Sequence, residues 1–389
     1  MTIIEVKDQQ GWKLFHPLPH RIYSHLPQWI CPIESDVENI FNPEKNKAFD
    51  HGEAQVFVLL DDKKEPVGRI AVFLDYERNE QQAYPTGGIG FFECVENQEY
   101  AFALFAHAEQ ILKEKGVKAI DGPVNFGERD KFWGLLVKGF EHYPVYQEYY
   151  HPPYYQAFFE NWGFQPYEQV LTLRGTNLGV PIERFRPLAA RVKERYNLTV
   201  RHIDTNNLEK LATELSTFYN ETFHFQPYFK PLEFKLVHAL LKEIRPILDP
   251  KLACFVYDGE HPIGFCGLLP EVNPFMRHVH GKMNKWKLLW FIIKLKMTKP
   301  KPMKGLLFGV HPDFQRKGIF PVLVDFLYTK YLTDNYDDVF LATIRGHNKI
   351  MIDTCANLNV KPDRVHVAYR KMLDETIEFK PLDFIEVDI

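Results

Sequence analysis

The chain has 389 residues, 45% hydrophobic and 25% charged, a balance that excludes a disordered chain, a collagen-like repeat and a small disulfide scaffold. This length predicts two or three domains. Forty-seven Lys and Arg against 51 Asp and Glu give a formal net charge of −4, whereas proteins that bind nucleic acid through phosphate contacts carry a clear basic excess. We therefore expect no nucleic-acid partner, and any basic function must be local.

The cysteines and the N-terminus predict a soluble, cytoplasmic protein with reduced thiols. The five cysteines are scattered, and no two have the Cys-x-x-Cys spacing of a zinc site, so we expect neither a metal site nor a disulfide framework. The first residues lack the charged and then apolar segments of a signal peptide. The apolar run Leu288–Ile293 is far shorter than the roughly 20 residues that span a bilayer.

Strand and helix patterns alternate along the first half. Two β-rich runs, Ala54–Leu60 and Pro66–Leu74, are separated by a polar turn and predict a hairpin, and Gly87–Cys94 predicts a third strand. Apolar residues at helical spacing predict a helix over Tyr100–Gly116. The later elements expected in this half are a strand at Val117–Ile120, a short aromatic helix at Tyr154–Trp162 and a strand at Gln169–Leu173.

The same order recurs in the second half, after a helix predicted over Pro181–Tyr196. Strands are expected at Leu198–Ile203, Leu252–Tyr257, His261–Leu269, Gly305–Val310, Asp338–Ile344 and His366–Met372, and helices at Asn207–Phe223, Phe234–Leu248, Phe320–Leu332 and Asn348–Leu358. The pattern predicts an α/β protein with mixed sheets. Its two domains would span residues 1–175 and 198–389, joined by a linker helix at 176–197.

The stretch from Gly305 to Pro321 is the most informative, because an apolar strand leads through a basic loop into an amphipathic helix. The first turn of a helix presents unpaired N–H groups and a partial positive charge, which suit a phosphate or pyrophosphate. Gly318 allows close approach of a ligand to the backbone, and Arg316 and Lys317 add positive charge. The loop therefore predicts a phosphate-binding site.

The segment Val310-His-Pro-Asp-Phe-Gln-Arg-Lys-Gly resembles motif A of the GCN5-related N-acetyltransferase (GNAT) superfamily, whose signature is Gln/Arg-x-x-Gly-x-Gly/Ala. In that family the loop amides hold the pyrophosphate of acetyl-CoA, and a bulge in the preceding strand binds the pantetheine. The resemblance covers roughly Leu198–Leu373. It implies that acetyl-CoA or another acyl-CoA binds at Val310, Gln315, Arg316, Lys317, Gly318, Ile319, Phe320 and Asn348. Val310 would place a main-chain N–H near the thioester carbonyl, and Asn348 would lie beside the CoA arm.

The first half also resembles this family, since Tyr154–Phe164 is similar to its tyrosine-bearing motif B. The whole chain thus resembles a tandem GNAT-like protein of bacteria, with two GNAT-like domains. Some positions depart from the pattern: Phe320 replaces a Gly or Ala, Pro321 removes an N–H, and Cys355 lies where the family often has a general-acid tyrosine. The first half lacks the Gln/Arg-x-x-Gly loop and has the acidic segment Glu93–Glu99 instead, so we expect that domain not to bind CoA.

The resemblance implies an N-acyltransferase that moves an acyl group to a primary amine on a small molecule or peptide. Because the amine must lose a proton, such an enzyme needs a nearby base. Glu271 is the first candidate, and His311 and His347 follow because histidine titrates near neutrality. Cys355 could act as an acid or a nucleophile. For each of these residues, a solvated or packed side chain without a catalytic role is the alternative.

A basic insert at 282–304 leaves further alternatives open. Its apolar residues spread widely around a helical wheel, with lysines at two opposite edges. This favours a half-buried helix covering the active-site mouth over contact with a membrane surface. Two other functions also stay open. Phe320 and Pro321 suggest a non-catalytic CoA-binding or scaffolding protein. The insert suggests a tandem-domain transferase that uses an aminoacyl-tRNA or a long-chain acyl donor.

Overall fold

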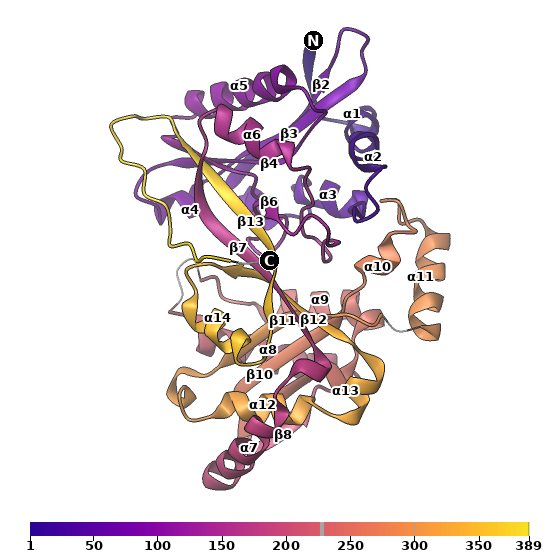
Figure 1. The fold of residues 1–389 in the computed structure, drawn as a ribbon, viewed down its shortest axis with the longest axis vertical. Helices are drawn as coiled ribbons and strands as arrows, with labels where there is room; N and C mark the ends of the chain where they lie inside the picture. Colours follow the sequence, from indigo (N-terminus) through magenta and orange to yellow (C-terminus); the bar gives the residue numbers. More distant parts are fainter. Residues whose placement is uncertain (226–228, 299, 388) are drawn as a thin grey trace.

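One continuous mixed sheet runs through the molecule. The computed structural model describes residues 1–225, 229–298, 300–387 and 389. Within them, thirteen strands follow the order β1-β2-β3-β4-β5-β13-β7-β12-β11-β10-β9-β8, with β6 paired to β13 off this path. The first half of the chain forms one end of the sheet and the second half the other (Figure 1).

The first half contains the predicted hairpin, third strand and amphipathic helix, which the structure confirms. Its strands are β1 (Thr2–Glu5), β2 (Gly52–Leu60), β3 (Pro66–Asp75), β4 (Thr86–Cys94), β5 (Ala119–Gly122), β6 (Leu135–Lys138) and β7 (Gln165–Thr176). Its helices are α1 (Gln9–Phe15), α2 (Pro17–Tyr23), α3 (Glu34–Ile40), α4 (Tyr76–Glu80), α5 (Gln98–Glu114) and α6 (Tyr154–Asn161).

The second half repeats this order after α7 (Ile182–Tyr196). Its strands are β8 (Thr199–His202), β9 (Ala253–Asp258), β10 (His261–Pro270), β11 (Met303–Val310), β12 (Asp338–Arg345) and β13 (Lys361–Met372). Its helices are α8 (Leu208–Phe223), α9 (Phe234–Ile244), α10 (Asn273–Met276), α11 (Lys285–Met297), α12 (Ile319–Leu327), α13 (Lys330–Asn335) and α14 (Lys349–Ala356).

Two predicted helices of this half differ in the structure. The single helix predicted over Phe320–Leu332 is wrong, because the chain leaves the helical conformation at Tyr328 and α13 starts anew. The Thr329 hydroxyl accepts the N–H of Leu332 and caps this second helix. Helix α9 ends at Ile244 rather than Leu248, because Pro246 has no N–H to continue the helical hydrogen bonds.

The last strand of each half crosses into the sheet of the other half. Strand β13, from the C-terminal end of the chain, pairs with β5 and β7 of the first half. Strand β7 in turn pairs with β12 of the second half. The two crossing strands lie side by side at the centre of the molecule, where Figure 1 shows them between the two ends. Each half is therefore completed by a strand of the other.

Buried ion pairs join these central strands. Glu168 on β7 is only 2% exposed and accepts hydrogen bonds from Arg129, Trp133 and Arg345, each at 3.0 Å. Burial alone would raise the pKa of Glu168, but the guanidinium groups of Arg345 and Arg129 hold it below its ordinary value. Arg345 belongs to β12, so this cluster ties the two halves together. None of the helices within the described ranges is both long and apolar enough to cross a membrane.

Candidate acyl-CoA cleft

Strands β11 and β12 diverge and open a wedge in the sheet of the second half. They are parallel but paired only at Met303 with Val339 and at Lys304 with Phe340. Immediately beyond this point, β11 bulges: Gly305 and Leu307 have partners on β10, whereas Leu306 between them has none. The pairing of β12 with β7 is also irregular, because its register shifts between Leu341 and Ile344. Bulges bend strands, which explains why the two strands separate here.

A largely apolar cavity of about 220 Å³ occupies this wedge and extends between α12 and α14. Leu306, the bulged residue, is 56% exposed. The wall is formed chiefly by aliphatic side chains, which suit an extended apolar chain or thioester arm. The residues that line the cavity on the strands and helices include Gly305, Leu306, Leu307, Phe308, Leu341, Ala342, Phe320, Leu323, Val324, Leu327, Met351 and Cys355.

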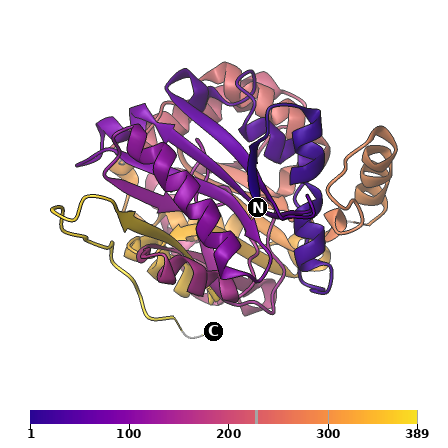
Figure 2. The ribbon, with the colours of Figure 1, turned by 90° about the horizontal axis from the view of Figure 1, so that it is seen from above.

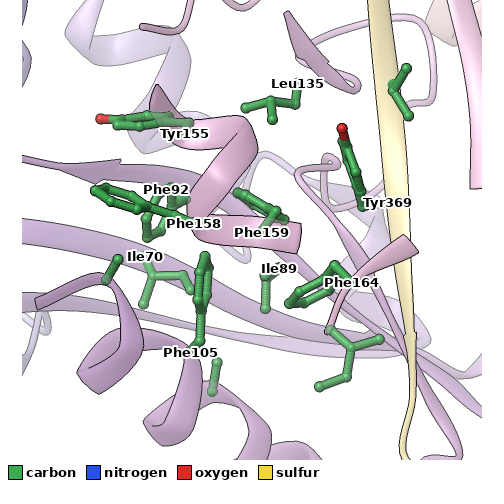
Figure 3. Packing of buried hydrophobic residues seen from close by; sticks show 14 of the residues in the cluster. Ile70, Ile89, Phe92, Phe105, Leu135, Tyr155, Phe158, Phe159, Phe164 and Tyr369 are labelled. Atoms are coloured by element: carbon green, nitrogen blue, oxygen red, sulfur yellow. The ribbon is translucent and has the colours of Figure 1, made fainter. Parts of the chain in front are cut away.

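In the first half, the equivalent space is filled by aromatic side chains. Strand β4 has a bulge at the equivalent place, at Phe91 and Phe92, and Phe91 has a φ of 48°. The ring of Phe92 stacks on Phe105 of α5 at 4.7 Å and contacts Tyr155 of α6 at 5.1 Å (Figure 3). The N–H of Phe91 donates to the Tyr149 hydroxyl at 2.8 Å. Side chains of the first half thus fill the space that is open in the second half, and the Tyr149 hydroxyl accepts the amide of Phe91 at the bulge.

The predicted phosphate loop lies at one end of the cavity. Gly318 caps the N-terminus of α12 with a φ of 85°, and the Cβ of any other residue there would come within 2.8 Å of Val192. The side chains of Gln315, Arg316 and Lys317 are exposed, whereas Ile319 is buried in the core, so only its main chain is available to a ligand. Two residues beyond Gly318, Phe320 already lines the cavity.

The other residues implied by the resemblance have local roles in the structure. Val310 pairs in regular register with Gly264, four residues beyond the bulge at Leu306. Asn348 caps α14, because its side-chain oxygen accepts the N–H of Met351 at 3.1 Å. His347 is exposed next to it. The bulge in this strand therefore lies at Leu306, a position that no local sequence pattern indicates.

Glu271 is buried beside the paired end of β11. It directly follows β10 and is 1% exposed. Its Oε1 accepts the N–H of Asn273 at 2.8 Å and that of Tyr146 at 3.1 Å, whereas Oε2 has no hydrogen-bond partner among the residues that the structure describes. Burial raises the pKa of Glu271, although the ammonium of Lys304 opposes the shift. Tyr146 comes from the first half, so the first half helps to shape this side of the wedge.

The three predicted catalytic residues are not brought together. Glu271 bonds to Pro302, just before β11, and His311 follows its last residue. At about 3.3 Å per residue, the eight residues of β11 separate them by about 26 Å. Neither is among the cavity-lining residues, whereas Cys355 is. One reaction centre therefore cannot use both Glu271 and His311.

Replacing Cys355 with alanine is expected to leave turnover within about three-fold of the wild-type rate. Burial raises the pKa of its thiol to about 12, so the thiolate that a nucleophile requires is scarce near neutral pH. The measurement is the steady-state kcat of both proteins at pH 7.5. A loss of 100-fold or more in a folded Cys355→Ala variant would instead assign the thiol a chemical role.

The basic insert forms a helix, but this helix does not cover the cavity. Helix α11 packs through Phe291 on a cluster that includes Ile30 and Ile33 of the first half. None of the described residues of the insert before Met303 lines the cavity. The expectation of a helix over the active-site mouth is therefore wrong for this cavity. Lys299 of the insert lies outside the described residues.

The strand order is repeated in the two halves, and the second half adds the diverged strands and the loop before α12. The protein therefore has the tandem GNAT fold. It is similar to the tandem GNAT protein from the clavulanic acid biosynthesis pathway, with a TM-score of 0.52, 11% identity, and coverage of 95% of this chain and 98% of that one. It is also similar to the glucosamine N-acetyltransferase region of a fungal multi-domain GH3 β-N-acetylglucosaminidase, with a TM-score of 0.55 and 11% identity. That match covers 95% of this chain but only 38% of the fungal one.

Two curated proteins are similar in sequence. Bacterial ceramide synthase of Caulobacter vibrioides is 27% identical over 327 residues, which are 81% of this chain and 82% of that protein. Protein YghO of Escherichia coli is 26% identical over 377 residues, 93% of each chain. No model of a known protein family matches the sequence.

Proposed function

We propose that the protein is an N-acyltransferase that moves an acyl group from acyl-CoA to a primary amine. The observation that carries this proposal is the open apolar cavity between the diverged strands β11 and β12, with a basic helix N-terminus at one end. The equivalent space in the first half is filled, so we assign one acyl-CoA site to each chain.

The loop before α12 would bind the pyrophosphate of CoA. Unpaired amides at a helix N-terminus attract phosphate groups, and Arg316 and Lys317 are exposed beside them. Pro321 has no backbone N–H to donate in this first turn, so Arg316 and Lys317 would contribute a larger share of the pyrophosphate binding. The pantetheine arm would then run along the cavity from Phe320 toward the bulge of β11.

The bulge at Leu306 would place backbone amides near the thioester carbonyl, where they would stabilise the oxyanion that forms when the amine attacks. In this step the C–N bond forms, the C–S bond breaks, and the CoA thiolate takes up a proton. Glu271 is the base that we propose for the amine. Burial raises its pKa and so makes it a stronger base than a solvated carboxylate, and its Oε2, which has no partner among the described residues, would accept the proton.

We further propose that both the acyl chain and the amine belong to lipids. A ceramide is a long-chain amino alcohol carrying a fatty acyl group on its nitrogen, and the similarity to a bacterial ceramide synthase spans most of both chains. The aliphatic wall of the cavity suits a fatty acyl chain better than a polar donor. A long-chain acyl donor, which the basic insert at 282–304 suggests as an alternative, is thus part of this proposal.

Reversing the charge of the loop tests the CoA site. We expect the double variant Arg316→Glu, Lys317→Glu to raise the KM for palmitoyl-CoA by about 10- to 100-fold, or about 1.4–2.8 kcal/mol for both contacts together. Charge-assisted phosphate contacts are strong, but those made by exposed side chains are partly screened by solvent and salt. Both side chains are exposed, so the fold should tolerate the change. The measurement is thiol release from palmitoyl-CoA in the presence of a long-chain amino alcohol.

The matched control is Lys235→Glu, an exposed lysine on α9. Its KM should equal that of the wild type. An unchanged KM in the double variant would contradict the loop assignment. Binding of CoA without turnover on short-chain or long-chain amines would favour the non-catalytic alternative.

A further inference from the structure

Helix α11 carries a stripe of large apolar side chains that face solvent. Trp286 and Met297 are 80% and 79% exposed, and Leu289, Trp290 and Ile293 are also exposed. These five residues follow the spacing i, i+3, i+4, i+7 and i+11, so they lie within an arc of about 100° on the helix. We call them the outer stripe. Monomeric soluble proteins rarely expose such a continuous apolar face without a function for it.

The opposite side of α11 attaches the helix to the protein. Phe291 is buried and Leu295 packs beside it, in the cluster formed with Ile30 and Ile33. The Lys287 ammonium donates to the Val279 carbonyl at 2.6 Å. The helix therefore has two apolar faces, one packed on the protein and one largely exposed to solvent, where the ring of Trp290 contacts that of His278 at 5.9 Å. This explains why the apolar residues spread so widely on the helical wheel.

Lysines border the outer stripe on both sides. Lys285 and Lys296 lie along one edge and Lys294 along the other, each within about 40° of the nearest stripe residue around the helix axis. The segment 282–304 contains eight lysines and no acidic residue, in a chain with a net charge of −4. Apolar and aromatic side chains flanked by lysines match the composition of helices that lie in the interface of an anionic bilayer.

The position of α11 leaves the outer stripe accessible. Helix α11 projects from the body of the molecule in two perpendicular views, at its outer edge (Figures 1 and 2). With Phe291 directed toward the protein, the outer stripe is directed away from it. A flat surface could therefore contact this stripe without rearrangement of the fold.

We propose that α11 docks the protein on an anionic lipid surface, with the outer stripe in the acyl-chain boundary and the lysines at the headgroups. Tryptophan and lysine favour this arrangement, because each combines an apolar body with a polar end. The docking itself does not depend on the proposed function. If that function holds, docking would keep the enzyme at the surface where its lipid amine resides.

Flotation of the full chain with vesicles tests the proposal. The vesicles contain phosphatidylcholine alone or an equal mixture with phosphatidylglycerol, in 0.1 M salt and without CoA. We expect binding to the mixed vesicles, at least ten-fold weaker binding to the neutral ones, and a blue shift of tryptophan fluorescence. The variant Trp286→Ser, Ile293→Ser, Met297→Ser should lose at least ten-fold in binding to the mixed vesicles.

The matched control changes three exposed apolar residues of α9, as Phe234→Ser, Leu236→Ser, Leu240→Ser, and should bind like the wild type. Circular dichroism checks the fold of both variants. The proposal is overturned if the wild type does not float, if the α11 variant floats equally well, or if the stripe instead mediates self-association in sedimentation experiments. Because no turnover is measured, failure here is distinct from failure of the acyltransferase proposal.

Discussion

Replacing Val324 with tryptophan is expected to lower turnover of palmitoyl-CoA by more than 100-fold while the protein remains folded. Val324 is half-buried on α12 and lines the cavity between the diverged strands. An indole at this position would enter the space that we assign to the pantetheine and acyl chain. Adding volume to a side chain usually destabilises a protein because it displaces the packed core. Here the larger side chain can enter the open cavity instead.

The control for this variant is Asp325→Asn, one residue further along α12. Asp325 is outside the set of cavity-lining residues and lies 3.7 Å from Arg186. We expect its turnover to stay within about two-fold of wild type, because a partly exposed ion pair contributes little. The measurement is kcat/KM for both variants, with thermal unfolding as the check on folding. Near-normal turnover by Val324→Trp would mean that the substrate does not occupy this cavity.

The second large effect is expected on stability, from Glu168→Gln. This change leaves Arg129 and Arg345 without their carboxylate at the junction of the two halves. Breaking a buried ion pair costs about 3–5 kcal/mol. We expect about 3 kcal/mol, the lower end, because Arg129 keeps 31% of its side chain exposed. Chemical denaturation measures the free energy of unfolding.

The same pair predicts a pH dependence of stability. The pKa of Glu168 is lower in the folded protein than in the unfolded chain, so its contribution is fully present above the unfolded value of about 4.3. It is lost as the pH falls through the folded pKa. The wild type should therefore lose more stability than Glu168→Gln between pH 5 and pH 3. Glu183→Gln, an 81% exposed control, should change stability by less than about 0.5 kcal/mol. A cost below about 1 kcal/mol for Glu168→Gln would contradict this role of the cluster.

Local patterns in the sequence predict the elements that local forces determine. Alternating apolar residues predict the hairpin of β2 and β3, and helical spacing predicts α5. The basic loop with Gly318 is predicted because a positive φ and exposed cations are properties of a few adjacent residues. The helix predicted over Pro181–Tyr196 is confirmed as α7, which is rich in charged residues.

The exchange of the last strands depends on long-range pairing, and the sequence does not predict it. A buried strand such as β13 has the same composition whether its neighbours are β12 and β11 or β5 and β7. The bulge at Leu306 also depends on long-range pairing, since it is a shift in register against β10, and local sequence patterns do not predict it. Glu271 and Tyr146 are 125 residues apart in sequence, and only the fold places the first half beside this carboxylate.

The position of α11 illustrates a further limit. Its sequence shows apolar residues around much of the helix, and this pattern does not tell which face meets the protein. The buried position of Phe291 resolves this in the structure and leaves Trp286 on the free side. Helical spacing alone therefore predicted the helix but not its location.

The acyl-CoA site is tested most directly by calorimetric titration of the wild-type chain with octanoyl-CoA, which stays monomeric at the concentrations required. We expect one site per chain, because aromatic side chains fill the equivalent space among the described residues of the first half, and we expect loss of that site in Val324→Trp. Two sites per chain, or equal binding by Val324→Trp, would contradict the assignment of the cavity between β11 and β12. Absence of binding to the wild type would contradict the acyl-CoA site as a whole.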